Sequence, residues 1–157
     1  MTSQASSDSP GPLRPSDWRV GVWRSFLLSH AIVIRELERE LATTGLPLPW
    51  YDVLLQLVEA PGHRLRMAEL AQRVLLSRSG LTRLVDRLQA EGFVRREPAS
   101  EDARGTFTVL TRAGFEALRA AAPVHLLGVR NHWLAHYSDA ELRTLGELLA
   151  RVTPAAE

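Results

Sequence analysis

Apolar positions recur at helical spacing from about residue 17 onward. The first series, which includes one histidine, has steps of four, three, four, three and four residues, so its members share one helix face: Trp23, Leu27, His30, Ile34, Leu37 and Leu41. Gly45 and Pro47 are expected to end this helix. A second helix is predicted from about Trp50 to Ala60, ahead of a break at Pro61 and Gly62.

The middle of the chain predicts two short helices joined by a tight turn. The apolar positions of the first helix are Met67, Leu70, Ala71 and Val74. Ser77 is expected to cap the second helix, which runs to about Glu91 and ends at Gly92. The buried face of that helix is predicted to comprise Leu81, Leu84, Val85 and Leu88, and its polar face carries Arg78, Ser79, Thr82, Arg83 and Arg87.

The pattern then becomes that of β-strands. Phe93 to Glu97 and Thr106 to Leu110 are predicted to form a two-stranded hairpin. Thr111 is expected to cap a long helix, in which Pro123 should produce a break or a kink. A capping box at Ser138 to Glu141 opens the last helix, whose apolar face comprises Leu142, Leu145, Leu149 and Val152.

These elements predict a mainly α fold with a small β-hairpin wing. Residues 61–110 form a winged helix-turn-helix lobe, and residues 17–60 and 111–153 form a helical region for dimerisation and lobe support. The two terminal helices lack enough partners within one small subunit, so their seams are expected to bury against a second copy. Residues 1–16 are small, polar and proline-rich, which predicts a flexible tail.

Composition narrows the class of protein. The chain has 157 residues, of which 45% are hydrophobic and 24% are charged, typical of one globular domain. It has no stretch of about 18 apolar residues and no signal-peptide pattern at its start, so we expect a cytoplasmic protein that contacts no membrane. The absence of cysteine excludes thiolate zinc sites, cysteine nucleophiles and cysteine redox sensors. Of the two methionines, Met67 is expected to pack inside the lobe.

Positive charge is concentrated in the predicted lobe. All 19 basic residues are arginines, and eight of them lie between residues 63 and 96 beside three acidic residues. This segment therefore carries +5 and the rest of the chain carries −4, because the total is +1. A basic centre between acidic flanks is expected where one segment binds a polyanion.

Double-stranded DNA is the polyanion that this arrangement favours. The second helix of the motif fits the major groove, where short side chains at Ser77, Ser79 and Thr82 permit close approach and arginines supply charge. Arg66 is placed to contact phosphate at the start of the preceding helix. Two alternatives are an amphipathic subdomain whose arginines only face solvent and a winged helix used for protein contacts. The wing and the charge asymmetry favour DNA over the first alternative, and a winged helix used only for protein contacts would not need the arginine-bearing polar face.

Two stretches resemble the MarR family of bacterial transcriptional regulators. One is Leu76-Ser-Arg-Ser-Gly-Leu-Thr-Arg-Leu-Val-Asp-Arg-Leu88 with Glu91-Gly-Phe-Val-Arg-Arg96, and the other is Asp102-Ala-Arg104 with Leu110-Thr111-Arg-Ala-Gly114. The resemblance covers about residues 17–153. It implies a homodimeric repressor that a small aromatic or anionic ligand releases from a pseudo-palindromic operator.

The resemblance also implies roles for individual residues. Ser77, Ser79, Thr82 and Arg83 would address the major groove, while Arg104, steadied by Asp102, would enter the minor groove. Ala103 stands where many relatives have a further arginine, and Glu97 and Glu101 lie nearby, so this wing should attract phosphate less strongly.

The resemblance places an effector crevice between the dimer helices and the lobe. Candidates to line it are His30, Trp50 and Tyr51. A packed imidazole at His30 and hydrophobic anchors at Trp50 and Tyr51 are the structural alternatives.

Other chemistries have less support in the sequence. His125, His132 and His136 would share a helix face if Pro123 leaves the helix intact, and the last two match a zinc-binding spacing, so a zinc-responsive regulator is the alternative function. No cysteine or acid joins them on that face. The residue after His132 is Trp133, so the HExxH motif is absent, as are the GxSxG, phosphate-loop and GxGxxG motifs. We therefore expect neither an enzyme nor a cofactor.

Overall fold

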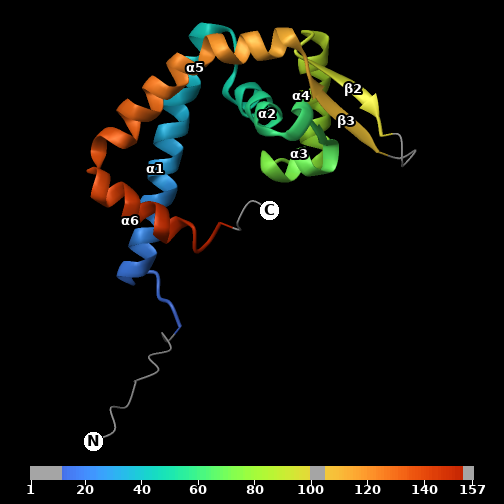
Figure 1. Cartoon of the computed structure of the whole chain (residues 1–157). Helices are drawn as coiled ribbons and strands as arrows, with labels where there is room; N and C mark the ends of the chain where they lie inside the picture. Colours follow the sequence, from blue (N-terminus) through green and yellow to red (C-terminus); the bar gives the residue numbers. More distant parts are fainter. Residues whose placement is uncertain (1–11, 100–104, 154–157) are drawn as a thin grey trace, which may run out of the picture.

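A computed structural model describes residues 12–99 and 105–153 of the chain (Figure 1). In chain order the elements are α1 (Trp18–Leu41), η1 (Ala42–Thr44), α2 (Leu48–Glu59), η2 (Pro61–His63), β1 (Arg64–Arg66), α3 (Met67–Arg73), α4 (Arg78–Ala90), β2 (Val94–Pro98), β3 (Thr106–Leu110), α5 (Arg112–His132), η3 (Leu134–His136) and α6 (Asp139–Leu149). The predicted mainly α class with a small β element is confirmed.

The lobe is built from α2, α3, α4 and the sheet around one apolar core. Helix α4 buries the four residues predicted for it, Leu81, Leu84, Val85 and Leu88. They join the buried side chains of α2 and α3, which include Leu54, Leu57 and Leu70. This core fixes the orientation of α4, so its opposite, polar face turns outward.

The sheet has three strands, whereas the sequence predicted two. The strand order is β1-β3-β2, and β1 pairs antiparallel with β3 through Leu65 and Thr108. The prediction of a simple hairpin was therefore incomplete. Strand β1 is only Arg-Leu-Arg, so one buried residue, Leu65, is its entire apolar pattern.

Local capping signals in the sequence are realised as predicted. The side chains of Ser77 and Thr111 accept hydrogen bonds from backbone N–H groups at the starts of α4 and α5, and Ser138 and Glu141 form a reciprocal capping box. Gly92 follows α4 with φ of 74°, a left-handed conformation that favours glycine.

Helix α5 connects the lobe to α1. It starts at the wing, lies against α2, and then packs beside α1, where Gly128 fits closely against Leu37 and Glu40 (Figure 1). Of the two outcomes expected at Pro123, the break is absent, because Pro123 lies inside a continuous α5, and the helix changes direction along its course in Figure 1.

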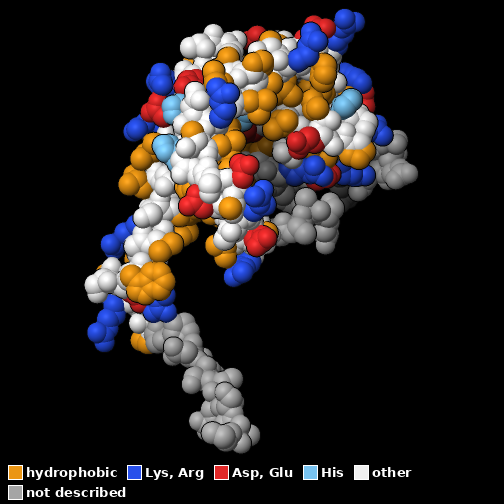
Figure 2. Space-filling view, turned by 60° about the vertical axis from the view of Figure 1, so that its left-hand side comes forward, with side chains coloured by type: hydrophobic (Ala, Val, Ile, Leu, Met, Phe, Trp, Pro, Cys, Tyr) orange, Lys and Arg blue, Asp and Glu red, His pale blue; other side chains and the backbone are white. Residues whose placement is uncertain are grey.

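The terminal helices leave much apolar surface uncovered. Helix α6 has no fully buried residue: Leu142, Leu145 and Leu149 are half-buried, and Val152 beyond it is 79% exposed. The first half of α1 exposes a larger set, Trp18, Val22, Trp23, Phe26, Leu27 and Leu28. Figure 2 shows hydrophobic side chains reaching the surface in this part of the molecule. Among the described residues, no helix is long and apolar enough to cross a membrane.

Candidate nucleic-acid interface

The exposed face of α4 carries the polar residues that the sequence singled out. Ser77 Oγ accepts a hydrogen bond from the Gly80 N–H at 3.1 Å, so this hydroxyl caps the helix. Thr82 Oγ1 donates to the Arg78 carbonyl at 2.8 Å, and the Ser79 side chain is exposed beside Ser77. Short hydroxyl side chains therefore cover the first turns of α4, which allows its backbone to approach a ligand closely.

Three arginines of α4 are available to an external anion. Arg78, Arg83 and Arg87 are exposed, and no ion pair within residues 12–99 and 105–153 holds any of them. Guanidinium groups bind phosphate oxygens through two parallel hydrogen bonds. The face therefore combines unpaired positive charge with small polar side chains.

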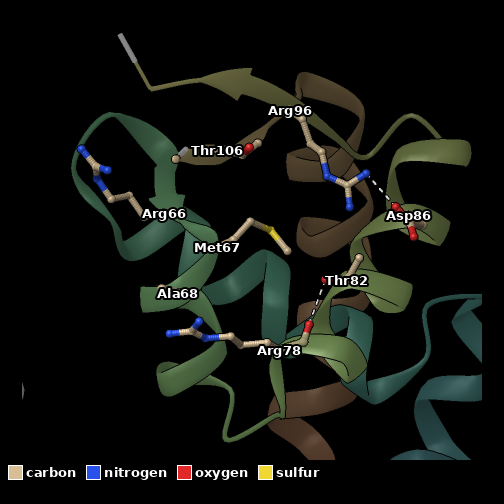
Figure 3. A pocket seen from close by; sticks show the side chains of 9 residues that line it. Arg66, Met67, Ala68, Arg78, Thr82, Asp86, Arg96 and Thr106 are labelled. Atoms are coloured by element: carbon tan, nitrogen blue, oxygen red, sulfur yellow. Dashed lines mark hydrogen bonds and ion pairs between the residues drawn. The ribbon is translucent and has the colours of Figure 1, made fainter. Parts of the chain in front are cut away.

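Hollows flank α4 on both sides, so the helix projects as a ridge. One, of about 580 Å³, lies between α4, the start of α3 and the wing, and Arg66, Arg78, Thr82 and Arg96 are among its lining residues (Figure 3). The other, of about 690 Å³, lies beside Pro49 of α2, and its lining includes Arg83 and Arg87. A projecting helix with arginines on both flanks is complementary in shape and charge to a DNA major groove.

Arg96 is a residue of this site that sequence reasoning missed. It extends from β2 across the hollow, and its Nη1 lies 2.6 Å from Oδ1 of Asp86 on α4 (Figure 3). Residues of a strand alternate between its faces, so Arg96 points to α4 while Arg95 points away. The sequence shows that Arg95 and Arg96 lie on opposite faces of the strand, but only the tertiary fold shows which of these faces α4 covers.

Arg66 and Met67 occupy the junction of β1 and α3. Arg66 is the last residue of β1 and the N-cap of α3, which agrees with its predicted place before that helix. Met67 packs inside the lobe as predicted, since its Sδ accepts a hydrogen bond at 3.0 Å from Thr108, which is fully buried.

The predicted wing tip lies outside the described residues. This applies to Asp102 and Arg104, and to the neighbouring Glu101 and Ala103. Glu97 is described, and its carboxylate lies 2.6 Å from Arg95 and 3.8 Å from Arg64. The negative charge that Glu97 brings to the wing is thus compensated locally.

Within residues 12–99 and 105–153, the three candidate effector residues have different surroundings. His30 lines an apolar hollow of about 250 Å³ between α1 and α5, together with Phe26, Val33, Ile34, Val129 and Trp133. Trp50 packs edge-on against Phe93, with ring centroids 6.1 Å apart, and Tyr51 is buried with its ring 4.3 Å from that of His125. Trp50 and Tyr51 thus make the packing contacts of their structural alternative, and their part in an effector site stays a prediction.

The C-terminal histidines are not brought together. Helix α5 ends at His132 and His136 lies in η3, so the expectation that all three share one helix face was wrong. His132 Nε2 lies 2.8 Å from Glu40 Oε1, and His125 packs on Tyr51, where burial lowers the pKa of its imidazole. Within the described part of the chain, no group of three or more His, Cys, Asp or Glu residues is arranged to hold a metal ion.

Known proteins match both this sequence and this fold. A sequence model of the MarR family matches residues 44–105. The HTH-type transcriptional repressor YetL of Bacillus subtilis is 32% identical over 121 residues, which cover 74% of this chain and 72% of YetL. Two MarR family transcriptional regulators from Streptomyces coelicolor share the fold with TM-scores of 0.83. AbsC is 33% identical (90% of this chain, 95% of AbsC), and Sco3205, in complex with DNA, is 35% identical (93% and 95%).

Proposed function

The chain belongs to the MarR family of transcriptional regulators, and on this premise we propose that it is a homodimeric repressor that binds a pseudo-palindromic DNA operator. In this proposal a small aromatic or anionic ligand releases the dimer from its operator. The family consists of regulators, not enzymes. The histidines of the described residues do not converge on one site, so the zinc-responsive alternative has no support in the structure.

The exposed polar face of α4 is the observation that carries the DNA-binding proposal. Its hydroxyls permit close approach to base edges, and its three arginines are unpaired within the described residues. The structure of Sco3205 in complex with DNA supports the same assignment by similarity. In the proposed complex, Ser77, Ser79, Thr82 and Arg83 address the major groove, Arg66, Arg78 and Arg87 contact phosphates, and Arg104 with Asp102 addresses the minor groove.

The uncovered apolar surface supports the homodimer. Large apolar side chains are exposed along α1 and α6, which lie away from the lobe, and clustered exposed apolar surface marks interaction sites. A second copy related by two-fold symmetry would cover them and place two α4 helices about one DNA turn apart. Two half-sites roughly 10 base pairs apart follow from that spacing.

Reversible binding of a small molecule is the proposed route of induction. The hollow at His30 is lined almost entirely by apolar and aromatic side chains, which suits an aromatic ligand. The chain has no cysteine, so thiol oxidation cannot replace ligand binding. Release by such a ligand should be graded and reversed by dilution. Loss of DNA binding after peroxide treatment that only a reductant restores would contradict this route.

Selection of genomic DNA fragments by the purified protein tests the DNA-binding proposal. The retained fragments are expected to share a pseudo-palindrome, and operator affinity should fall about a thousandfold or more between 50 and 200 mM salt if roughly six to ten phosphates are contacted. Arg83→Ala and Arg104→Ala should weaken binding. Arg112→Ala removes the same charge from the start of α5, where Arg112 pairs with Glu116, and should leave DNA binding unchanged. A flat salt response, or retention of fragments without a common sequence, would refute the proposal.

A further inference from the structure

Two arginines of β1 share one aromatic ring on the outer face of the sheet. Arg66 pairs in register with Phe107 of β3, and Arg64 pairs with Val109, so both arginines project from the same face as Phe107. The guanidinium carbon of Arg64 lies 4.8 Å from the centroid of the Phe107 ring, and that of Arg66 lies 5.2 Å from it. Cation–π attraction thus holds both side chains against one ring.

This arrangement concentrates positive charge that the described residues compensate only in part. Glu97 is the acidic group nearest Arg64, at 3.8 Å, but its carboxylate is held at 2.6 Å by Arg95. No ion pair within residues 12–99 and 105–153 involves Arg66. Two like charges on one ring repel each other, so an anion placed between them would relieve the repulsion and gain two charge-assisted hydrogen bonds.

The arginine pair is continuous with the candidate nucleic-acid interface. Arg66 also lines the hollow between α4 and the wing, and in Figure 3 the Arg66 and Arg78 side chains reach toward the same side, away from Arg96. Arg66 directly precedes α3, and Arg64 lies two residues earlier on the same face of β1, opposite the face on which Arg96 reaches α4. A DNA phosphate that contacts Arg66 on this outer face would therefore also be within reach of Arg64.

We propose that Arg64, Phe107 and Arg66 form a clamp for a backbone phosphate of the operator, outside the segment that α4 reads. The proposal deepens the proposed function and rests on it. Alternate residues of a strand are about 7 Å apart, a span that the oxygens of one phosphodiester and two extended guanidinium groups bridge. Phe107 preorders both arginines, which reduces the conformational entropy lost when they bind. The contact orients the lobe on DNA and carries no sequence information.

Phosphate ethylation interference on the operator selected above tests the clamp directly. With the unmodified protein, one phosphate in each half-site, outside the α4 footprint, should block binding when it is ethylated. With Arg64→Ala that interference should disappear, operator affinity should fall about tenfold, and the slope of log affinity against log salt should decrease by about 1 for each protomer. The ratio of operator to random-sequence affinity should stay unchanged, because no base contact is lost.

Two further variants separate a clamp from a general loss of charge. Arg112→Ala makes the same change in net charge at an exposed position beside Glu116 and should leave affinity and footprint unchanged. Glu97→Gln removes the acid nearest Arg64 and should strengthen binding. The clamp is refuted if Arg64→Ala keeps the original operator affinity and footprint. It is also refuted if Arg112→Ala weakens operator binding as much as Arg64→Ala does. Failure of the unmodified protein to select DNA would instead refute the proposed function itself.

Discussion

Arg96 on β2 and Asp86 on α4 form an ion pair, with Nη1 and Oδ1 2.6 Å apart. In the described residues it is the one ion pair that joins the wing to the helix proposed to read DNA. Both side chains are partly exposed, so the pair contributes little to stability, typically below about 1 kcal/mol. Its position suggests that it sets the angle between wing and helix and neutralises an acid that would otherwise face phosphate.

A double-mutant cycle on this pair is the first prediction. Arg96→Gln should weaken operator binding because it frees the Asp86 carboxylate beside the DNA and loosens the wing. In an Asp86→Asn background the same change should cost less, with a coupling of about 1 kcal/mol, or roughly fivefold in affinity. Fluorescence anisotropy with a labelled operator measures all four variants. Equal effects of Arg96→Gln in both backgrounds would contradict the role of the pair.

Features that depend on residues close together in the chain could be predicted from the sequence, whereas features that depend on distant residues could not. Caps at Ser77, Thr111 and Ser138 depend on residues three positions away, so the sequence alone predicted them. Strand β1 forms only by pairing with β3, more than forty residues later, so its three residues carried no sufficient pattern. Trp50 and Tyr51 are adjacent aromatic residues, yet they pack against different partners, Phe93 and His125, which only the tertiary fold determines.

The second prediction concerns assembly. Leu27 lies on the predicted seam of α1 and is 45% exposed in one protomer, whereas Leu75, in the turn before α4, is 91% exposed. Leu27→Asp should abolish the dimer at micromolar concentration, because assembly would bury an unpaired carboxylate in each protomer. Leu75→Asp should leave the dimer intact. Sedimentation velocity distinguishes the two outcomes, and a stable monomer of the unmodified protein would refute the dimer altogether.

The third prediction uses two glycines in different surroundings. A Cβ on Gly114, in the first turn of α5, would overlap the carbonyl oxygen of Phe93, while a Cβ on Gly146 of α6 would meet nothing within 4 Å. Gly114→Ala should therefore destabilise the protein by about 1–3 kcal/mol, because a backbone atom must move. Gly146→Ala meets no atom of its own chain, and alanine is favoured over glycine in a helix by about 0.5–1 kcal/mol, so it should cost far less than Gly114→Ala. Chemical unfolding at fixed protein concentration measures both changes, and equal effects would contradict the close packing at Gly114.

His125 gives the last prediction, on the pH dependence of stability. Its ring packs on Tyr51, its Nδ1 is buried without a hydrogen-bond partner among the described residues, and this burial lowers its pKa below the ordinary 6.5. Below pH 6.5 the His125 side chain of the unfolded chain binds a proton more readily than that of the folded chain. The contribution of neutral His125 to the free energy of unfolding is therefore complete above pH 6.5 and is lost as the pH falls. His125→Phe keeps the stacked ring and removes the titration, so its unfolding free energy should fall less between about pH 6.5 and 5. Hydrogen bonds lower the pKa values of Glu36 and Glu141 from 4.5, so the contribution of these groups to protein stability is lost only at pH values below about 4.5. Parallel pH profiles for the two proteins would show that His125 is not the responsible group.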